Sequence, residues 1–363
     1  MIVLGIETSC DETSAAIIEG DKKEPYVKLL SNIVSSSLLL HAKTGGIIPE
    51  KAAREQVKYI IPVLEKALGE GKVDKKDIDA IGVTVGPGLI GSLLVGVETA
   101  KTLSYIWEKP LIPVNHLYGH IYANFVSEIS NLKSQISNIE VPEFPAIALI
   151  VSGGHTDLVL MKNHGNLKWL GGTRDDAAGE AFDKIGRVLG LSYPGGEHIE
   201  KLAKNTSEDF FNFPRPLINS GDFDFSFSGL KTAVFRQISQ IKNLDEKTIS
   251  SICYSTQQAI IDVLVTKTLN AAIEFDVKSI LLGGGVAANN SLRGNFKFQI
   301  SNLKLDTKFF VPEKRLCTDN AAMIATAAFF STKGRSASGG NKIGMPWQKV
   351  DAIPDLYFDT AQY

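Results

Sequence analysis

The sequence predicts an α/β protein of two related lobes, because one design occurs twice along the chain. IVLGIETSCDETSAAII (2–18) and PAIALIVSGGHTDLVLM (145–161) each contain an apolar strand, a small polar turn and a second apolar strand. Each is followed by a strand, a glycine turn and a helix, in DAIGVTVGPGLIGSLLVG (79–96) and in KSILLGGGVAANNSLR (278–293). A repeated unit of this kind favours two lobes, each with its own core.

The polar stretch SEISNLKSQISNIEVPEFP (127–145) separates the two copies and is the predicted linker. We expect an N-terminal lobe over residues 1–140 and a C-terminal lobe over 141–324, with 325–363 able to return to the first lobe. A duplicated α/β unit with two glycine-bearing hairpins resembles the superfamily of actin, sugar kinases and Hsp70, whose lobes are ribonuclease-H-like. That resemblance implies a nucleotide cleft between the lobes.

Composition is ordinary for a globular enzyme, with 44% hydrophobic and 21% charged residues. The formal net charge of −2 gives no general attraction to nucleic acid, so an RNA contact requires a local basic patch or a partner protein. Three scattered cysteines make no disulfide framework and suit a reducing cytoplasm, and the opening MIVLGIETSC does not read as a leader peptide.

One uncharged stretch, from Ala80 to Val97, is close to the length of a membrane span. Gly86-Pro87-Gly88 interrupts it directly after the β-rich run IGVTV. We therefore interpret it as a buried strand, a tight turn and a buried helix, and expect no association with a membrane.

HLYGH (116–120) places two histidines four residues apart, so on a helix both imidazoles face the same side and can reach one ion. The protease motif HExxH has the same spacing and a glutamate that acts as general base. Leu117 stands at that glutamate's position here, which argues against peptide hydrolysis. A helix that merely carries two histidines remains the alternative.

Two glycine turns are suited to a nucleotide. In Ser152-Gly153-Gly154-His155-Thr156, exposed N–H groups and hydroxyls can donate to a phosphate, although Gly-Gly is also favoured in ordinary hairpins. Gly283-Gly284-Gly285 precedes a helix and offers a floor without side chains for a purine. Asn289 or Asn290 can bind the sugar or base, or cap that helix, or do both.

Two carboxylates stand out from the acidic residues of the second half. Asp183 lies among apolar residues in AFDKIGRVLGL, where a carboxylate requires a partner such as a ribose hydroxyl pair. Asp319 begins the helix of TDNAAMIATAAFF, where it is either an N-cap or a third ligand for the histidine pair. Two histidines and one aspartate leave positions open on an ion, as in a working metal site.

Ten motifs, taken together and in order, resemble the TsaD family of tRNA N6-adenosine threonylcarbamoyltransferases, formerly described as O-sialoglycoprotein endopeptidases. They run from Ile2 to about Ala327, and the Glu-Ala-Phe-Asp core is closer to the bacterial and organellar branch. The motifs are GIETSCDETS, GGIIPE, GPGL, HLYGH, SGGHT, DDAAGEAFDK, YPGG, FSFSGLKT, GGGVAAN and CTDNAAMIA.

The resemblance implies roles for individual residues. His116, His120 and Asp319 would bind one divalent ion, iron (Fe²⁺) or zinc (Zn²⁺), and the sequence does not distinguish the two. Asp11 and Glu12 would lie in the loop facing the site, together with Ser9, and are the candidate catalytic residues. The residues implied to bind an adenylate substrate are Ile150, Val151, Ser152, Gly153, Gly154, Asp183, Gly196, Glu200 and Asn289.

The implied substrates are threonylcarbamoyl-adenylate and the unpaired adenosine at position 37 of tRNAs that read codons beginning with A. The exocyclic amine attacks the carbamoyl carbon, N6-threonylcarbamoyladenosine (t6A) forms and AMP leaves. Expected partners are tRNA, a TsaB-like paralogue and a TsaE-like ATPase, with a homodimer as the other assembly. The sequence departs from the family pattern in PEKAAREQ, where Ala53 and Gln56 replace a serine and a histidine, and in YPGGE, which carries Glu197.

Two other activities are compatible with parts of the pattern. An ATP-dependent small-molecule kinase would keep the fold but would have no use for the His116, His120 and Asp319 set. A metalloprotease would use the ion but lacks the glutamate next to His116.

Overall fold

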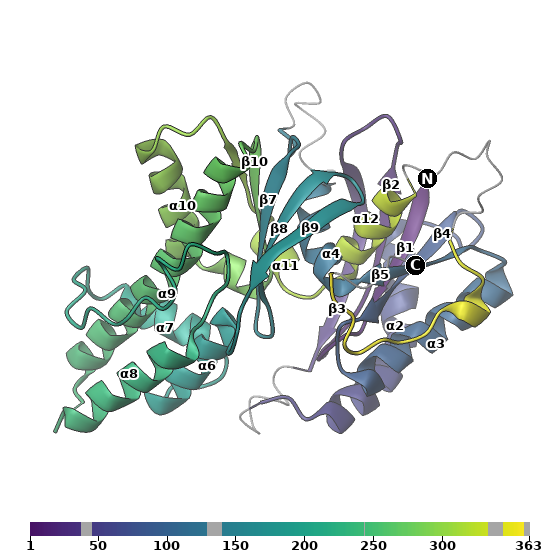
Figure 1. The fold of residues 1–363 in the computed structure, drawn as a ribbon. Coiled ribbons are helices and arrows are strands. Elements are labelled where there is room, and N and C mark those ends of the chain that lie inside the picture. Colours follow the sequence, from purple (N-terminus) through teal and green to yellow (C-terminus); the bar gives the residue numbers. More distant parts are fainter. Residues whose placement is uncertain (38–45, 129–139, 243, 333–343, 359–363) are drawn as a thin grey trace. The chain divides into compact units, whose positions relative to one another are not determined.

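The computed structural model describes residues 1–37, 46–128, 140–242, 244–332 and 344–358, drawn in colour in Figure 1. The chain divides into two compact units. Unit 1 comprises Met1–Val141, Asn163–Asn166 and Thr318–Tyr363, and unit 2 comprises Pro142–Lys162 and Leu167–Cys317. Residues 129–139 of the predicted linker lie outside the described part.

Within the described residues, unit 1 contains a six-stranded sheet with helices on both faces (Figure 1). The strands, in sheet order, are β5 (Leu111–Asn115), β4 (Ala80–Gly86), β1 (Ile2–Glu7), β2 (Glu12–Gly20), β3 (Val27–Ser36) and β6 (Val126–Glu128). The helices are α2 (Pro49–Gly71), α3 (Ile90–Trp107), α4 (His116–Tyr122), η1 (Ala123–Phe125), α12 (Ala321–Ser331) and η4 (Trp347–Lys349).

The two faces of this sheet are packed differently. Large apolar side chains of β1, including Leu4 and Ile6, form a buried cluster with residues of α2 and α3. On the other face the small residues of α12 lie directly on the strands. A Cβ added to Gly5 would lie 2.3 Å from the carbonyl oxygen of Ala321, so only glycine permits this approach.

The described part of unit 2 contains a five-stranded sheet whose order matches that of unit 1 without β6. The strands, in sheet order, are β11 (Lys308–Phe310), β10 (Ser279–Gly283), β7 (Ala146–Val151), β8 (Thr156–Asn163) and β9 (Asn166–Gly172). The helices are α6 (Ala178–Val188), α7 (Gly195–Ala203), α8 (Ser228–Gln240), α9 (Glu246–Glu274), η3 (Gly285–Ala288), α10 (Asn290–Asn302) and α11 (Lys314–Cys317).

The strand pairings of the two sheets confirm the duplicated α/β fold. β1 pairs antiparallel with β2 and parallel with β4, and β4 pairs parallel with β5. In the same way β7 pairs antiparallel with β8 and parallel with β10, and β10 pairs parallel with β11. The uncharged stretch at 80–97 forms β4 and the start of α3. None of the helices in the described ranges has the length and apolar character that a bilayer span requires.

Candidate metal centre and nucleotide-binding residues

Close packing of α4 against α12 brings the two histidines of HLYGH to the chain that precedes α12. A Cβ added to Gly119 would lie 2.7 Å from Cδ1 of Ile324, so the glycine between the histidines permits the helices to approach. The Asn115 side chain caps α4 by accepting a hydrogen bond from the Leu117 N–H at 2.8 Å. His116 and His120 therefore occupy a short, fixed helix rather than a loop.

His116, His120 and Asp319 converge as the sequence predicts, and all three belong to unit 1. The Nε2 atoms of His116 and His120 lie 3.5 and 3.4 Å from Oδ1 of Asp319. One potential ligand atom from each residue lies within 4.8 Å of the others. Asp319 does not cap α12, because that role belongs to Asn320, whose Oδ1 accepts from the Met323 N–H at 3.1 Å.

The surroundings of His120 fit a bound cation. The residue is 1% exposed, and neither of its ring nitrogens forms a well-directed hydrogen bond with the described residues, although Asp319 faces Nε2. A buried imidazole nitrogen without such a bond is costly unless a metal ion coordinates it. Burial lowers the pKa of His120 more than the Asp319 carboxylate raises it, so its neutral, ligating form is favoured.

For His116, in contrast, the surroundings raise the pKa and favour the protonated ring. Burial by itself would lower its pKa, but the carboxylates of Asp319 and Glu7 outweigh burial and raise the pKa to about 9. A cation at this position would therefore displace a proton from His116. Leu117, at the position of the protease glutamate, is 0% exposed and apolar, so no general base lies beside His116 there.

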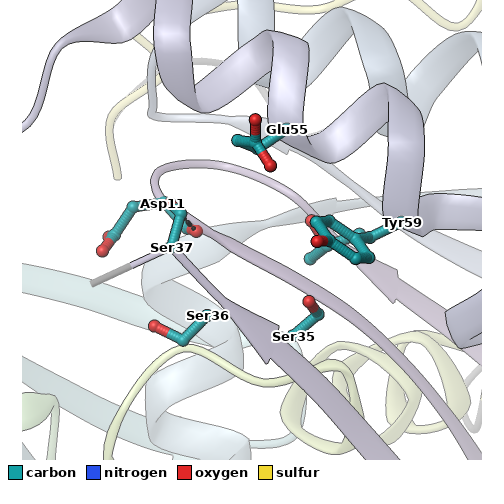
Figure 2. Close-up of a pocket in the computed structure, with 7 residues that line it drawn as sticks. Asp11, Ser35, Ser36, Ser37, Glu55 and Tyr59 are labelled. Carbon is teal, nitrogen blue, oxygen red and sulfur yellow. Dashed lines mark hydrogen bonds between the residues drawn. The ribbon is translucent and has the colours of Figure 1, made fainter. Parts of the chain in front are cut away.

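Of the two candidate catalytic carboxylates, Asp11 lies in the loop between β1 and β2, and Glu12 is the first residue of β2. Burial, together with repulsion from Asp319 and Asp11, raises the pKa of Glu12 to about 10. Asp11 lines a cavity of about 330 Å³ (Figure 2). Because its lining is acidic, hydroxyl-bearing and aromatic, this cavity suits an amine or hydroxyl group rather than a phosphate. The lining residues are Asp11, Thr13, Ser35, Ser36, Ser37, Glu55 and Tyr59.

Gln56 holds the same loop, a role that its sequence position alone did not reveal. It is 1% exposed, and its Nε2 lies 3.3, 3.1 and 3.0 Å from the carbonyl oxygens of Thr8, Cys10 and Glu12. The amide group carries two donors on one nitrogen, whereas a histidine would carry at most one on each ring nitrogen. The side chain at this departure from the family pattern therefore fixes the chain around the β1–β2 turn.

In unit 2 the two glycine turns lie at the same edge of the sheet. The parallel register pairs Gly283 with Ile150, which places the ends of β10 and β7 next to each other. A Cβ added to Gly284 would lie 2.4 Å from the carbonyl oxygen of Val151. At the hairpin tip, by contrast, no described atom lies within 4 Å of a Cβ added to Gly153 or Gly154, so that face is open.

Asp183 has a protein partner, where the sequence suggested a ribose. Its Oδ1 accepts a hydrogen bond of 2.7 Å from the N–H of Gly195, the first residue of α7. Burial raises the pKa of Asp183 more than the N–H groups of Gly195 and Gly196 lower it. Asp183 thus binds the positive end of a helix. Glu197, the departure in YPGGE, is an exposed residue in the first turn of the same helix.

Asn289 caps α10, which was one of its two predicted roles. Its Oδ1 accepts from the Leu292 N–H at 2.9 Å, and its Nδ2 donates to Oε1 of Gln257 at 2.9 Å. The neighbouring Asn290 donates to Oε1 of Glu200 at 2.6 Å. Glu200 and the two asparagines are therefore brought together at the start of α10, as a site for a sugar or base would require.

Comparison with known proteins identifies relatives along most of the chain. The TsaD family, described as tRNA N6-adenosine threonylcarbamoyltransferase, matches residues 28–326. The protein of that name from Halalkalibacterium halodurans is 46% identical over 346 residues, covering 95% of each chain. The one from Persephonella marina is 48% identical over 332 residues, covering 91% of this chain and 90% of its own.

Two solved structures share the fold at low sequence identity. HypF from T. kodakarensis aligns with a TM-score of 0.59 at 14% identity, over 92% of this chain and 47% of its own length. Full-length HypF in a phosphate- and nucleotide-bound form gives a TM-score of 0.57 at 12% identity, over 93% of this chain and 56% of its own. The sequence matches carry the assignment: the chain belongs to the TsaD family of tRNA N6-adenosine threonylcarbamoyltransferases.

Proposed function

We propose that this chain transfers the threonylcarbamoyl group of threonylcarbamoyl-adenylate to N6 of adenosine 37 in tRNAs that read codons beginning with A. The N6–carbon bond forms, the bond between the carbamoyl carbon and the phosphate oxygen breaks, and AMP leaves with t6A as the product. The observation that carries the proposal is the match to enzymes of this name over nearly the whole chain.

The adenylate half of the donor is assigned to unit 2. The open hairpin tip at Gly153 and Gly154 can bring backbone N–H groups to the phosphate without obstruction from a side chain. Glu200, which accepts a hydrogen bond from Asn290, would accept from ribose hydroxyls. Asp183 and Asn289 act mainly by fixing α7 and α10, because their side chains are bound to Gly195, Gln257 and Leu292. Gly196 adds an N–H beside Asp183.

In unit 1, His116, His120 and Asp319 would hold one divalent ion. This nitrogen and oxygen set suits Fe²⁺ or Zn²⁺. When bound, such an ion supplies Lewis acidity that draws charge from a carbonyl or phosphoryl oxygen.

The attacking amine must lose a proton, and two carboxylates near the metal site that could take it are Asp11 in the β1–β2 loop and Glu12 at the start of β2. Asp11 is one of the residues that line the cavity of Figure 2. The raised pKa of Glu12 favours its protonated form, which can donate a hydrogen bond but cannot accept a proton. Asp11 is therefore the better candidate for the base, and Glu12 becomes available only where a nearby cation stabilises its charge.

A TsaB-like paralogue is the partner we assign to the exposed side of α2 and α3. Val57 and Ile61 lie one turn apart on α2 and are 63% and 52% exposed. Ile90 and Leu94 lie one turn apart on α3 and are 50% and 44% exposed. Apolar side chains on adjacent helices suit a protein partner. Because the chain is nearly neutral, we assign part of the tRNA contact to partner proteins. These partners include a TsaE-like ATPase or, if the chain forms a homodimer, a second copy of it.

The proposal is tested with the purified chain, unmodified tRNA and threonylcarbamoyl-adenylate, with and without TsaB-like and TsaE-like proteins. After digestion of the tRNA, mass spectrometry of the nucleosides should detect t6A. Chelation should remove this product, and Zn²⁺ or Fe²⁺ should restore it. Absence of t6A under every partner condition, together with consumption of ATP on a small-molecule acceptor, would instead establish the kinase activity.

If the hairpin at 152–156 binds the phosphate, Gly154→Ala should weaken nucleotide binding without lowering the stability of the protein. Because an added Cβ meets no described atom within 4 Å, the midpoint of thermal unfolding should stay within about 2 °C of the parent value. The methyl group would, however, occupy the space assigned to the phosphate. We expect the affinity for AMP or a non-hydrolysable adenylate, measured by calorimetry, to fall by about 10-fold or more. Unchanged affinity would show that this hairpin does not bind the phosphate.

A further inference from the structure

Glu7, the last residue of β1, is a fully buried carboxylate that contacts a proposed metal ligand. It is 0% exposed, and its Oε2 lies 3.1 Å from Nδ1 of His116. Oε1 accepts a hydrogen bond of 2.5 Å from the Ser9 N–H, and Oε2 accepts one of 2.6 Å from the Thr84 hydroxyl. A buried carboxylate requires such donors, and His116 completes the set.

These contacts determine how the His116 ring is used. An ionised carboxylate can only accept hydrogen bonds, so Nδ1 must carry the hydrogen in the contact with Glu7. The Ser9 hydroxyl lies 3.1 Å from the same nitrogen and can also accept. In the neutral ring, the form that can bind a cation, the lone pair is then on Nε2, the nitrogen that lies 3.5 Å from Oδ1 of Asp319.

We propose that Glu7 is a positioning residue for the metal site: its carboxylate holds His116 as the Nδ1–H form, with Nε2 directed toward the ion. A carboxylate behind a ligating histidine fixes the ring and increases its basicity as a ligand. The inference rests on the proposed role of His116 as a ligand. The contact with Glu7 also distinguishes His116 from His120, because Nδ1 of His120 has no hydrogen-bond partner in the described part of the chain.

The test measures metal binding and does not depend on transferase activity. Zn²⁺ affinity of the metal-free protein is determined by competition with a chromophoric chelator for the parent and for Glu7→Gln. A glutamine that keeps its oxygen toward the Ser9 N–H turns its NH₂ group toward His116, which favours the wrong form of the ring. We expect Zn²⁺ to bind about 10- to 100-fold more weakly.

Thr84→Val is the matched control, because it removes a neighbouring donor to Glu7 but leaves the contact between Glu7 and His116. Its Zn²⁺ affinity should stay within about threefold of the parent. A double-mutant cycle with His116→Ala isolates the coupling: in that background Glu7→Gln should cause no further loss. An equal loss with and without His116, or no loss in Glu7→Gln alone, would overturn the inference.

A measurement on the unaltered sequence covers the case in which Glu7→Gln does not fold. Nitrogen-15 NMR of histidine-labelled, Zn²⁺-loaded protein should show the hydrogen of His116 on Nδ1 and the metal on Nε2. The reverse arrangement would overturn the role of Glu7 while leaving the metal site intact. If the parent protein binds no Zn²⁺, both the metal part of the proposed function and this inference are overturned. If it binds Zn²⁺ normally but forms no t6A, only the proposed transferase activity is overturned.

Discussion

Asp319→Asn is expected to abolish tight metal binding and to slow t6A formation by at least about 100-fold, which corresponds to about 2.7 kcal/mol of transition-state stabilisation. The asparagine keeps the shape of the side chain but removes the negative charge that faces both histidines. Asp319 also raises the pKa of Glu12 by repulsion. Its replacement also removes the attraction that raises the pKa of His116, so the two effects on the stability of the metal-free protein oppose each other. The measurements are Zn²⁺ affinity, single-turnover rates and thermal unfolding.

Asn320→Ala is the control for Asp319→Asn, because the two residues are adjacent and have different roles. Asn320 caps α12, so its loss should cost about 1 kcal/mol of stability while metal binding persists. If the Asp319→Asn variant were destabilised but still bound metal, the aspartate would stabilise the start of α12 and would not be a metal ligand.

Gly284→Ala should destabilise unit 2 by about 2–6 kcal/mol, the largest loss of stability that we expect from a single added methyl group. Gly284 has φ of 92° and ψ of 163°, a conformation that is essentially restricted to glycine. The new Cβ would also lie 2.4 Å from the carbonyl oxygen of Val151, on the strand that leads into the hairpin at 152–156. Thermal unfolding should begin at least about 5 °C lower, and adenylate affinity should fall with it.

Gly285→Ala provides the comparison for Gly284→Ala. No described atom lies within 4 Å of a Cβ added there, so its unfolding temperature should stay close to that of the parent. If both variants unfolded at the same temperature, the contact between the two glycine turns would not contribute to stability as the structure indicates.

The sequence predicted the repeated elements because their signals are local. Apolar runs bounded by glycine turns identified both hairpins and both strand–turn–helix segments, and the pairings confirmed the two copies. The spacing of His116 and His120 was equally local, because one helical turn brings the side chains to the same face. For Asp319, however, the local pattern fitted a helix cap equally well. The actual cap is Asn320, one residue later.

Other features of the site depend on residues that are far apart in the chain. Gln56 reads as a departure from the family pattern until its amide is seen to meet three carbonyls of the β1–β2 turn. Likewise, Glu7 carries no signal of its role in the motif GIETSCDETS, because its partner His116 is more than a hundred residues away.

The sequence by itself therefore determined the α/β class, the duplication, the family and the identity of the proposed ligands. These follow from periodicity, turn chemistry and motifs that are read over short distances. The tertiary structure decided which polar groups face one another: Glu7 with His116, Asp183 with the start of α7, and Gly284 with Val151. The physical reason is that burial and hydrogen-bond partners are properties of packed neighbours, and packing joins residues that the sequence keeps apart.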